Sequence, residues 1–123
     1  MYPSKQTKPL LLCVEDDPTH LKLRKAVLEK GGFNVIGVTT ANDAIKAVRE
    51  VPVCAVIADH MLQGTTGTEL AKALKKIKPD VPIIMYSGTL PNTLEPMNVY
   101  INKGEPTEVF IGLVREIVKR YCS

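Results

Sequence analysis

Three acidic residues in succession stand where the chain could bind a cation. Glu15, Asp16 and Asp17 directly follow residues 10–14, an apolar run that is typical of a buried strand. Two carboxylates about 4 Å apart repel each other by roughly 4 kcal/mol at an effective dielectric constant near 20. A cluster of acids at the edge of a core therefore either protonates one member or holds a divalent cation. Mg²⁺ suits such a cluster because it binds few carboxylates and keeps several waters.

Three further polar residues close apolar runs later in the chain. Asp59, Ser87 and Lys103 each come at or just after the end of one such run. If the runs are parallel strands, their carboxyl ends meet along one edge of a sheet, where ligands bind in open α/β folds. A metal ion, a lysine and a hydroxyl around one carboxylate form a phosphoryl-transfer site, where catalysis is mainly positioning and charge neutralisation. Asp59 would be the nucleophile, because an aspartate can carry a covalent phosphoryl group.

The elements that would position these residues alternate along the chain. Strands that are apolar throughout and alternate with helices predict an α/β fold, with a parallel sheet covered on both faces. Strands are predicted over residues 10–14, 33–38, 53–58, 81–86 and 99–101, and helices from Asp17-Pro18 to Gly31-Gly32, over 42–50, through 70–77 and over 106–122.

The spacing of apolar residues predicts which side of each helix faces the core. Asp17 is expected to cap the first helix, with Pro18 as its first residue. Basic residues such as Lys22, Arg24 and Lys25 are expected on a solvated helix surface. The core-facing residues are predicted to be Leu23, Val27 and Leu28 in the first helix, Ile45 and Val48 in the second, Leu70, Leu74 and Ile77 in the third, and Phe110, Leu113, Ile117 and Tyr121 in the last.

Composition limits the class of protein. With 123 residues, 45% of them hydrophobic and 24% charged, the chain fits one soluble domain over residues 9–122, after a polar tail at residues 1–8. It has no run as long as a membrane span and no signal peptide, so we expect a cytoplasmic protein with no membrane partner. The net charge is only +3, and the chain lacks the aromatic residues or the motif that accompany basic residues in a nucleic-acid binder. Cys13, Cys54 and Cys122 lack metal-binding spacing and are expected to be reduced thiols.

Four segments together resemble one family, the receiver domain of two-component response regulators. They are "LLCVEDDP", "AVIADHMLQGTTG", "PIIMYSG" and "YINK", each at the end of its own predicted strand. The resemblance runs from about Leu10 to Tyr121. It implies a flavodoxin-like, doubly wound parallel sheet of five strands in the order 2-1-3-4-5, with helices on both faces.

The resemblance also implies a role for each matching residue. Asp59 matches the phosphoacceptor, with Ser87 and Lys103 as the groups that contact the phosphoryl oxygens. Mg²⁺, or Mn²⁺ in its place, would be held by Asp59, by Asp16 directly, by Glu15 through water and by the backbone carbonyl of Met61. Tyr100 matches a switch residue that moves together with Ser87. Simpler interpretations also stand: Ser87 as an ordinary turn residue, Lys103 as a surface lysine, and Tyr100 as plain core.

The function implied is a phosphorelay receiver. It would take a phosphoryl group from a histidine kinase or histidine phosphotransfer protein and switch a surface that contacts an unknown downstream protein, with no nucleic acid bound by this chain. It would not be an enzyme beyond self-catalysed phosphoryl transfer and slow autodephosphorylation. An FMN binder is disfavoured because "EDDP" would repel a phosphate. A haloacid-dehalogenase-type phosphatase would need its nucleophile on the first strand. A phosphorylation-independent pseudo-receiver remains the alternative.

Two stretches depart from the family pattern. Pro91 and Pro96 lie in residues 88–98, where the family has its fourth helix, and proline inside a helix costs about 3 kcal/mol. That helix is therefore predicted to be short or degenerate. Gly104 replaces the proline that usually follows the lysine. Because a cis bond before a residue other than proline costs about 3 kcal/mol, the Lys103–Gly104 bond is predicted to be trans.

Overall fold

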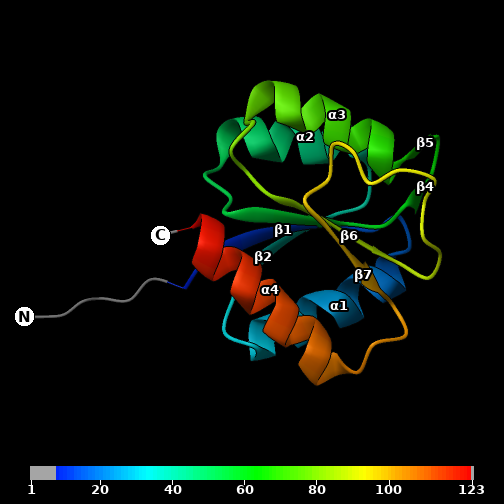
Figure 1. Ribbon diagram of the computed structural model, residues 1–123. Coiled ribbons are helices and arrows are strands. Elements are labelled where there is room, and N and C mark those ends of the chain that lie inside the picture. The colour runs from blue at the N-terminus through cyan, green and yellow to red at the C-terminus, as the bar shows by residue number, and fades with distance from the viewer. Residues whose placement is uncertain (1–7, 123) are drawn as a thin grey trace, which may run out of the picture.

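The computed structural model describes residues 8–122, so most of the predicted tail lies outside the described residues. Five parallel strands form a sheet in the order β2-β1-β3-β6-β7, which confirms the expected 2-1-3-4-5 arrangement (Figure 1). A small antiparallel pair, β4 and β5, follows β3. The strands are β1 Leu10–Val14, β2 Asn34–Val38, β3 Ala55–Ala58, β4 Met61–Leu62, β5 Thr65–Thr66, β6 Ile83–Ser87 and β7 Val99–Asn102.

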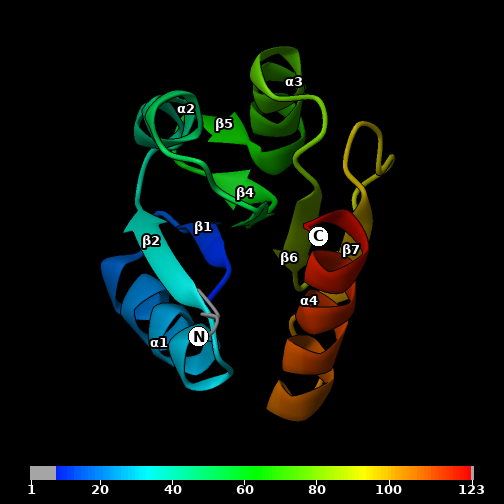
Figure 2. The same cartoon turned by 90° about the vertical axis from the view of Figure 1, so that its left-hand side faces the viewer.

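Four helices cover the two faces of the sheet. α1 and α4 lie on one face and α2 and α3 on the other, as Figures 1 and 2 show. Each layer encloses its own apolar cluster, so β1 and β3 at the centre are buried on both sides. This is the environment that their continuous apolar sequences predict. The helices are α1 Pro18–Lys30, α2 Ala41–Glu50, α3 Gly67–Ile77 and α4 Thr107–Tyr121.

The first helix begins and ends where predicted, but the side that it turns toward the core differs from the prediction. The Asp17 carboxylate caps it by accepting hydrogen bonds from the backbone N–H groups of Thr19 and His20. Leu28 is fully buried, but Leu23 is 63% exposed. Arg24 takes the inward position instead and is only 8% exposed. The prediction failed because it assumed that an arginine faces water, whereas this one has a buried ion-pair partner.

The last helix is also rotated relative to its predicted face. Phe110 is buried as expected, but Leu113 and Tyr121 are 40% and 46% exposed. The buried positions that follow are Ile111, Val114 and Val118, one, four and eight residues after Phe110. Apolar residues surround α4 on most sides, so spacing alone could not identify which ones touch the sheet.

Cys54 and Cys122 form a disulfide, which corrects the expectation of three reduced thiols. Their Cα atoms lie 5.7 Å apart, although 68 positions separate them in the sequence. The bond joins the segment just before β3 to the residue that follows α4. Cys13 is a free, buried cysteine, and burial raises the pKa of its thiol to about 11.

Residues 88–98 contain no helix, as their two prolines predict. The segment runs in irregular conformation from β6 to β7 (Figure 1). Its end is fastened by Asn98, whose side-chain oxygen accepts hydrogen bonds of 2.8 Å from the Ile83 backbone N–H and from Lys75 Nζ. Within residues 8–122, no helix is long and apolar enough to cross a membrane.

Candidate functional site

The carboxyl ends of four neighbouring strands place the predicted site residues along one edge of the sheet. Pairing of Val14 with Ala58 puts the residues after β1 beside the residue after β3. Pairing of Ser87 with Asn102 brings the end of β6 next to Lys103. The residues that the sequence places at strand ends therefore meet as expected from parallel topology.

The backbone around Asp59 is held by contacts that only glycine allows. The Gly67 N–H donates a 2.6 Å hydrogen bond to the carbonyl of His60. A Cβ atom at Gly67 would lie 2.4 Å from the Asp59 carbonyl oxygen, a distance no side chain could accommodate. The start of α3 is thus packed directly against the end of β3. This contact fixes the backbone from which the Asp59 side chain projects.

Asp59 is a buried carboxylate that contacts a lysine. The residue is 8% exposed, and Lys103 Nζ donates a 2.5 Å hydrogen bond to its Oδ2. Burial alone would raise the pKa of Asp59. The hydrogen bond and charge of Lys103 outweigh burial and, with smaller contributions from Glu15 and the Met61 backbone, hold this pKa below its ordinary value. Asp59 is therefore ionised at neutral pH.

Glu15 is more deeply buried than Asp59, with 2% of its surface exposed. Its Oε2 accepts a 3.1 Å hydrogen bond from the Asp17 N–H, and its Oε1 lies 3.0 Å from Arg24 Nη2 and 3.7 Å from Lys103 Nζ. Burial raises the pKa of Glu15, with a further rise from Asp59, although Asp17 and Arg24 oppose it. The two neighbouring carboxyls are thus shifted in opposite directions.

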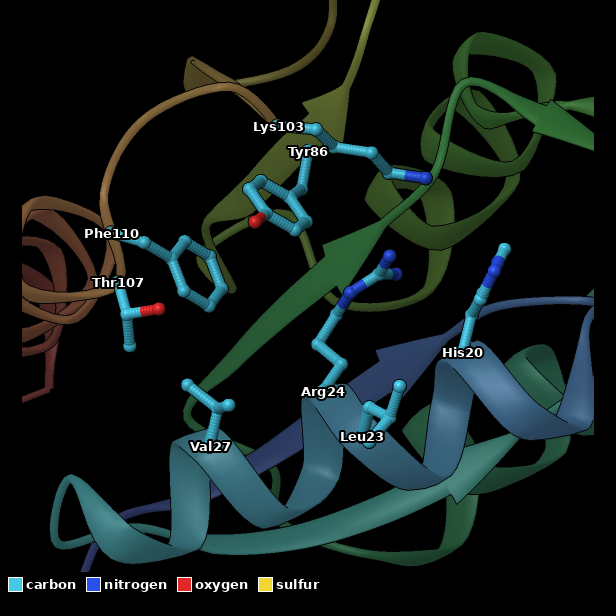
Figure 3. Close-up of a pocket in the computed structure, with 8 residues that line it drawn as sticks. All are labelled: His20, Leu23, Arg24, Val27, Tyr86, Lys103, Thr107 and Phe110. Carbon is cyan, nitrogen blue, oxygen red and sulfur yellow. The ribbon is translucent and has the colours of Figure 1, made fainter.

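Arg24 is the member of this site that the sequence analysis missed. Its guanidinium carbon lies 4.8 Å from the centre of the Tyr86 ring, in addition to the ion pair with Glu15. Figure 3 shows the side chain rising from α1 into the space between Tyr86, His20 and Lys103. Helical spacing could have predicted this position. Arg24 lies three residues after Leu21 and four before Leu28, and all three share the inward face of α1.

The residues expected to hold a metal are only partly assembled. Asp16 is half-buried and the Met61 side chain is 63% exposed. Across residues 8–122, no three acidic, histidine or cysteine side chains converge in a metal-binding arrangement. The donors present nonetheless fit Mg²⁺, a cation that takes oxygen ligands and keeps waters. Glu15 Oε1 is buried without a well-oriented hydrogen-bond donor among the described residues, so it could accept from a metal-bound water.

Ser87 and Tyr100 are linked through the backbone of β6. The Tyr100 hydroxyl donates a 3.1 Å hydrogen bond to the Ser87 carbonyl and accepts one from Asn102 Nδ2 at 3.0 Å. The Ser87 carbonyl also accepts from the Lys103 N–H at 3.0 Å, while Ser87 Oγ accepts from the Thr89 N–H at 3.3 Å. Tyr100 is half-buried and packs against the core, so its ring and its hydroxyl have separate contacts.

The peptide bond after Lys103 is trans, as predicted. Among the described residues the cis peptide bond is Glu95–Pro96. The Gly104 N–H donates a 2.7 Å hydrogen bond to Asn102 Oδ1. A trans bond at this position therefore still allows Lys103 to reach Asp59.

Comparison with known proteins identifies the family. The sequence model described as "Response regulator receiver domain" matches residues 11–103, three quarters of the chain. The chain therefore belongs to the receiver domain family of response regulators, which act in two-component signalling. Within the chain, α4 lies beyond the matched residues.

Curated relatives are longer proteins that share one region with this chain. A putative NtrX-like response regulator of Rickettsia bellii is 35% identical over 80 residues, covering 63% of this chain and 17% of the relative. The transcriptional regulatory protein ZraR of Salmonella typhimurium is 31% identical over 77 residues, covering 63% of this chain and 18% of the relative. The chain thus spans less than a fifth of the length of these relatives.

Solved structures share the fold over nearly the whole chain. A CheY-like receiver domain protein from Methanospirillum hungatei superimposes with a TM-score of 0.87 at 23% identity, covering 94% of this chain and 97% of that one. A receiver domain protein from Clostridium thermocellum has a TM-score of 0.84 at 22% identity, covering 91% and 95%. These likenesses establish the flavodoxin-like fold predicted from the sequence.

Proposed function

We propose that this chain accepts a phosphoryl group on Asp59 from a phosphohistidine donor and, once phosphorylated, changes a surface that contacts another protein. The observation that carries the proposal is the buried Asp59 carboxylate, hydrogen-bonded to Lys103 at the edge of the sheet. An aspartate held ionised and partly desolvated is a competent nucleophile toward phosphorus. The donor would be a histidine kinase or a histidine phosphotransfer protein, and a protein with such a donor would act in the cytoplasm.

In the proposed reaction an Asp59 carboxylate oxygen attacks the phosphorus of the donor. The P–O bond forms as the P–N bond to the donor imidazole breaks, and that imidazole takes up a proton. The ammonium group of Lys103 transfers its contact from the carboxylate to a phosphoryl oxygen, and the Ser87 hydroxyl donates to another. Catalysis by these residues consists of positioning and charge neutralisation. Apart from this transfer to itself and slow self-hydrolysis, the chain would have no enzymatic activity.

A divalent cation would complete the site. Asp16, Asp59 and the Met61 carbonyl would hold Mg²⁺ or Mn²⁺, with Glu15 acting through water. When bound, the cation supplies positive charge that offsets the charge of the phosphoryl oxygens. The partial exposure of Asp16 leaves its carboxylate accessible for this role.

Slow self-hydrolysis is supported by the residue two positions beyond the acceptor. Met61 is 63% exposed, and its thioether is too weak an acceptor to orient an attacking water. A phosphorylated state that decays within seconds, at a rate unchanged by Met61→Asn, would contradict this part of the proposal.

A phosphorylation-independent interaction module is the second candidate. It is favoured by the absence of a helix in residues 88–98, which removes part of the surface that reports phosphorylation. Acetyl phosphate with Mg²⁺ distinguishes the two candidates by intact-mass measurement. The receiver proposal expects a gain of one phosphoryl group that is lost in Asp59→Asn and in EDTA. No gain under any condition would favour the interaction module.

A further inference from the structure

Arg24 is a buried cation that takes no part in the proposed phosphoryl transfer. It is 8% exposed, lies on α1 rather than at a strand end, and is held by the Glu15 carboxylate and the face of Tyr86. An arginine at such a position is costly to desolvate unless it is paired, so its burial depends on these partners. The side chain borders a pocket of about 300 Å³ that Tyr86 and Lys103 also line (Figure 3).

The ion pair changes the charge balance of the acidic site. When all groups are ionised, Glu15, Asp16 and Asp59 carry three negative charges, and Lys103 supplies one positive charge. Arg24 supplies a second positive charge in contact with Glu15. The site is thus left with one unbalanced negative charge instead of two. A divalent cation entering this site meets less attraction than the three carboxylates alone would provide.

We propose that Arg24 is a positioning residue that holds Glu15 in an internal ion pair and thereby weakens the binding of divalent cations at the site. The inference rests on the proposed metal-dependent receiver function and specifies how its metal affinity is set. The guanidinium and the metal share Glu15 as a partner, directly or through water. Neutralising Arg24 frees Glu15 Oε1 and restores the second unbalanced charge.

Binding of Mn²⁺ to the protein tests the proposal without any phosphorylation. The electron paramagnetic resonance signal of free Mn²⁺ gives its dissociation constant for the wild type, Arg24→Met and Arg24→Gln at neutral pH. We expect both variants to bind Mn²⁺ at least about tenfold more tightly, because the positive charge in contact with Glu15 has been removed. If Arg24→Met fails to fold, Arg24→Gln provides the measurement, because its amide can still contact Glu15 without carrying a charge.

Three further variants separate a specific role from general charge or packing effects. Lys22→Gln removes one positive charge from the exposed side of the same helix and should leave the affinity within about twofold. Arg24→Lys keeps the charge and should stay within about threefold of the wild type. In Arg24→Met with Glu15→Gln both charges are absent, so the gain seen in Arg24→Met should disappear and the affinity should be no higher than that of the wild type.

The results distinguish this inference from the proposed function. Tighter Mn²⁺ binding by the neutral Arg24 variants supports the inference, whether or not acetyl phosphate modifies Asp59. Unchanged or weaker binding by folded Arg24→Gln overturns it, even if phosphorylation proceeds normally. Equal tightening in Lys22→Gln, or no Mn²⁺ binding by any variant, also overturns it.

Discussion

The site edge of the sheet and the segment at residues 88–98, which leaves that edge directly after Ser87, are built in opposite ways. At the site edge, Glu15, Asp59 and Ser87 are each less than a tenth exposed and are joined to charged or backbone partners. Along the segment, Leu90 and Leu94 are exposed, and two prolines prevent a helix. Residues that would perform the chemistry are thus buried and paired, while most of the connection that would report it is exposed.

This difference shows that the two parts of a receiver depend on different features of the sequence. The site needs single polar residues at the ends of buried strands, and the sheet positions them through its parallel register. In the receiver family a helix between the strands that match β6 and β7 forms part of the surface that reports phosphorylation, and proline at two positions removes that helix here. One chain can therefore keep the residues of the site while lacking this helix.

The largest effect is expected from Lys103→Ala, which removes a charged side chain from the site edge of the sheet. Loss of the ammonium group beside Asp59 should slow phosphorylation by acetyl phosphate roughly 10²- to 10³-fold, because a fixed charge at the transferring group is removed. The control is Lys119→Ala, an exposed lysine on α4. A reduction no greater than that of the control would show that Lys103 has no role in the transfer.

The same variant changes the titration of the nucleophile. Lys103 lowers the pKa of Asp59 in the folded protein, so its removal should move that pKa upward, toward the value that burial alone would give. The side-chain carboxyl carbon of Asp59, followed by NMR as the pH is lowered, reports the change. An unchanged or lower pKa would contradict the account of this contact.

Removing the disulfide at the opposite edge of the sheet should have the next largest effect, a loss of stability. Cys54→Ser opens a loop of 68 residues and should lower the free energy of unfolding by about 3–4 kcal/mol when the wild type is oxidised. Urea unfolding with and without reductant measures the difference. In reductant the two proteins should differ by much less, and Cys13→Ser serves as a control that leaves the bond intact. Equal stability under oxidising conditions would show that the bond does not form.

A smaller effect is expected at Asn98, where residues 88–98 meet the sheet. Asn98→Ala removes the acceptor used by the Ile83 N–H and Lys75 Nζ, and should cost about 1–2 kcal/mol of unfolding free energy. Asn92→Ala, within the exposed part of the same segment, should change stability by less than about 0.5 kcal/mol. Similar effects from both substitutions would mean that the segment is not anchored at Asn98.

The smallest effect is expected in amide exchange of the segment itself. Peptides covering residues 88–96 should exchange quickly, because no helix protects them, whereas those covering β7 should exchange slowly. A phosphoryl mimic such as beryllofluoride should slow exchange modestly near Ser87 and Thr89. Identical protection of residues 88–98 with and without the mimic would argue against a switching role for this segment.

The sequence was sufficient to place the predicted residues at one edge of the sheet, because they lie where local patterns are strongest. Apolar runs ending in Asp59 or Ser87 identify strand ends, and parallel topology then brings those ends together. The prolines likewise identified the missing helix. Arg24 and the Cys54–Cys122 bond could not be found in this way, because each depends on a partner in another element. A charged residue such as Arg24 can be buried only when the tertiary structure supplies a partner of opposite charge.

Asp59 is the residue that we propose becomes phosphorylated. The most direct measurement is to treat the protein with acetyl phosphate and Mg²⁺, reduce the product with borohydride and locate the reduced residue by peptide mass mapping. Because borohydride converts an aspartyl phosphate to homoserine, the account expects homoserine at position 59 and at no other aspartate, and none when Mg²⁺ is omitted. Homoserine at Asp16 or Asp17, or a protein that is never modified, would contradict it.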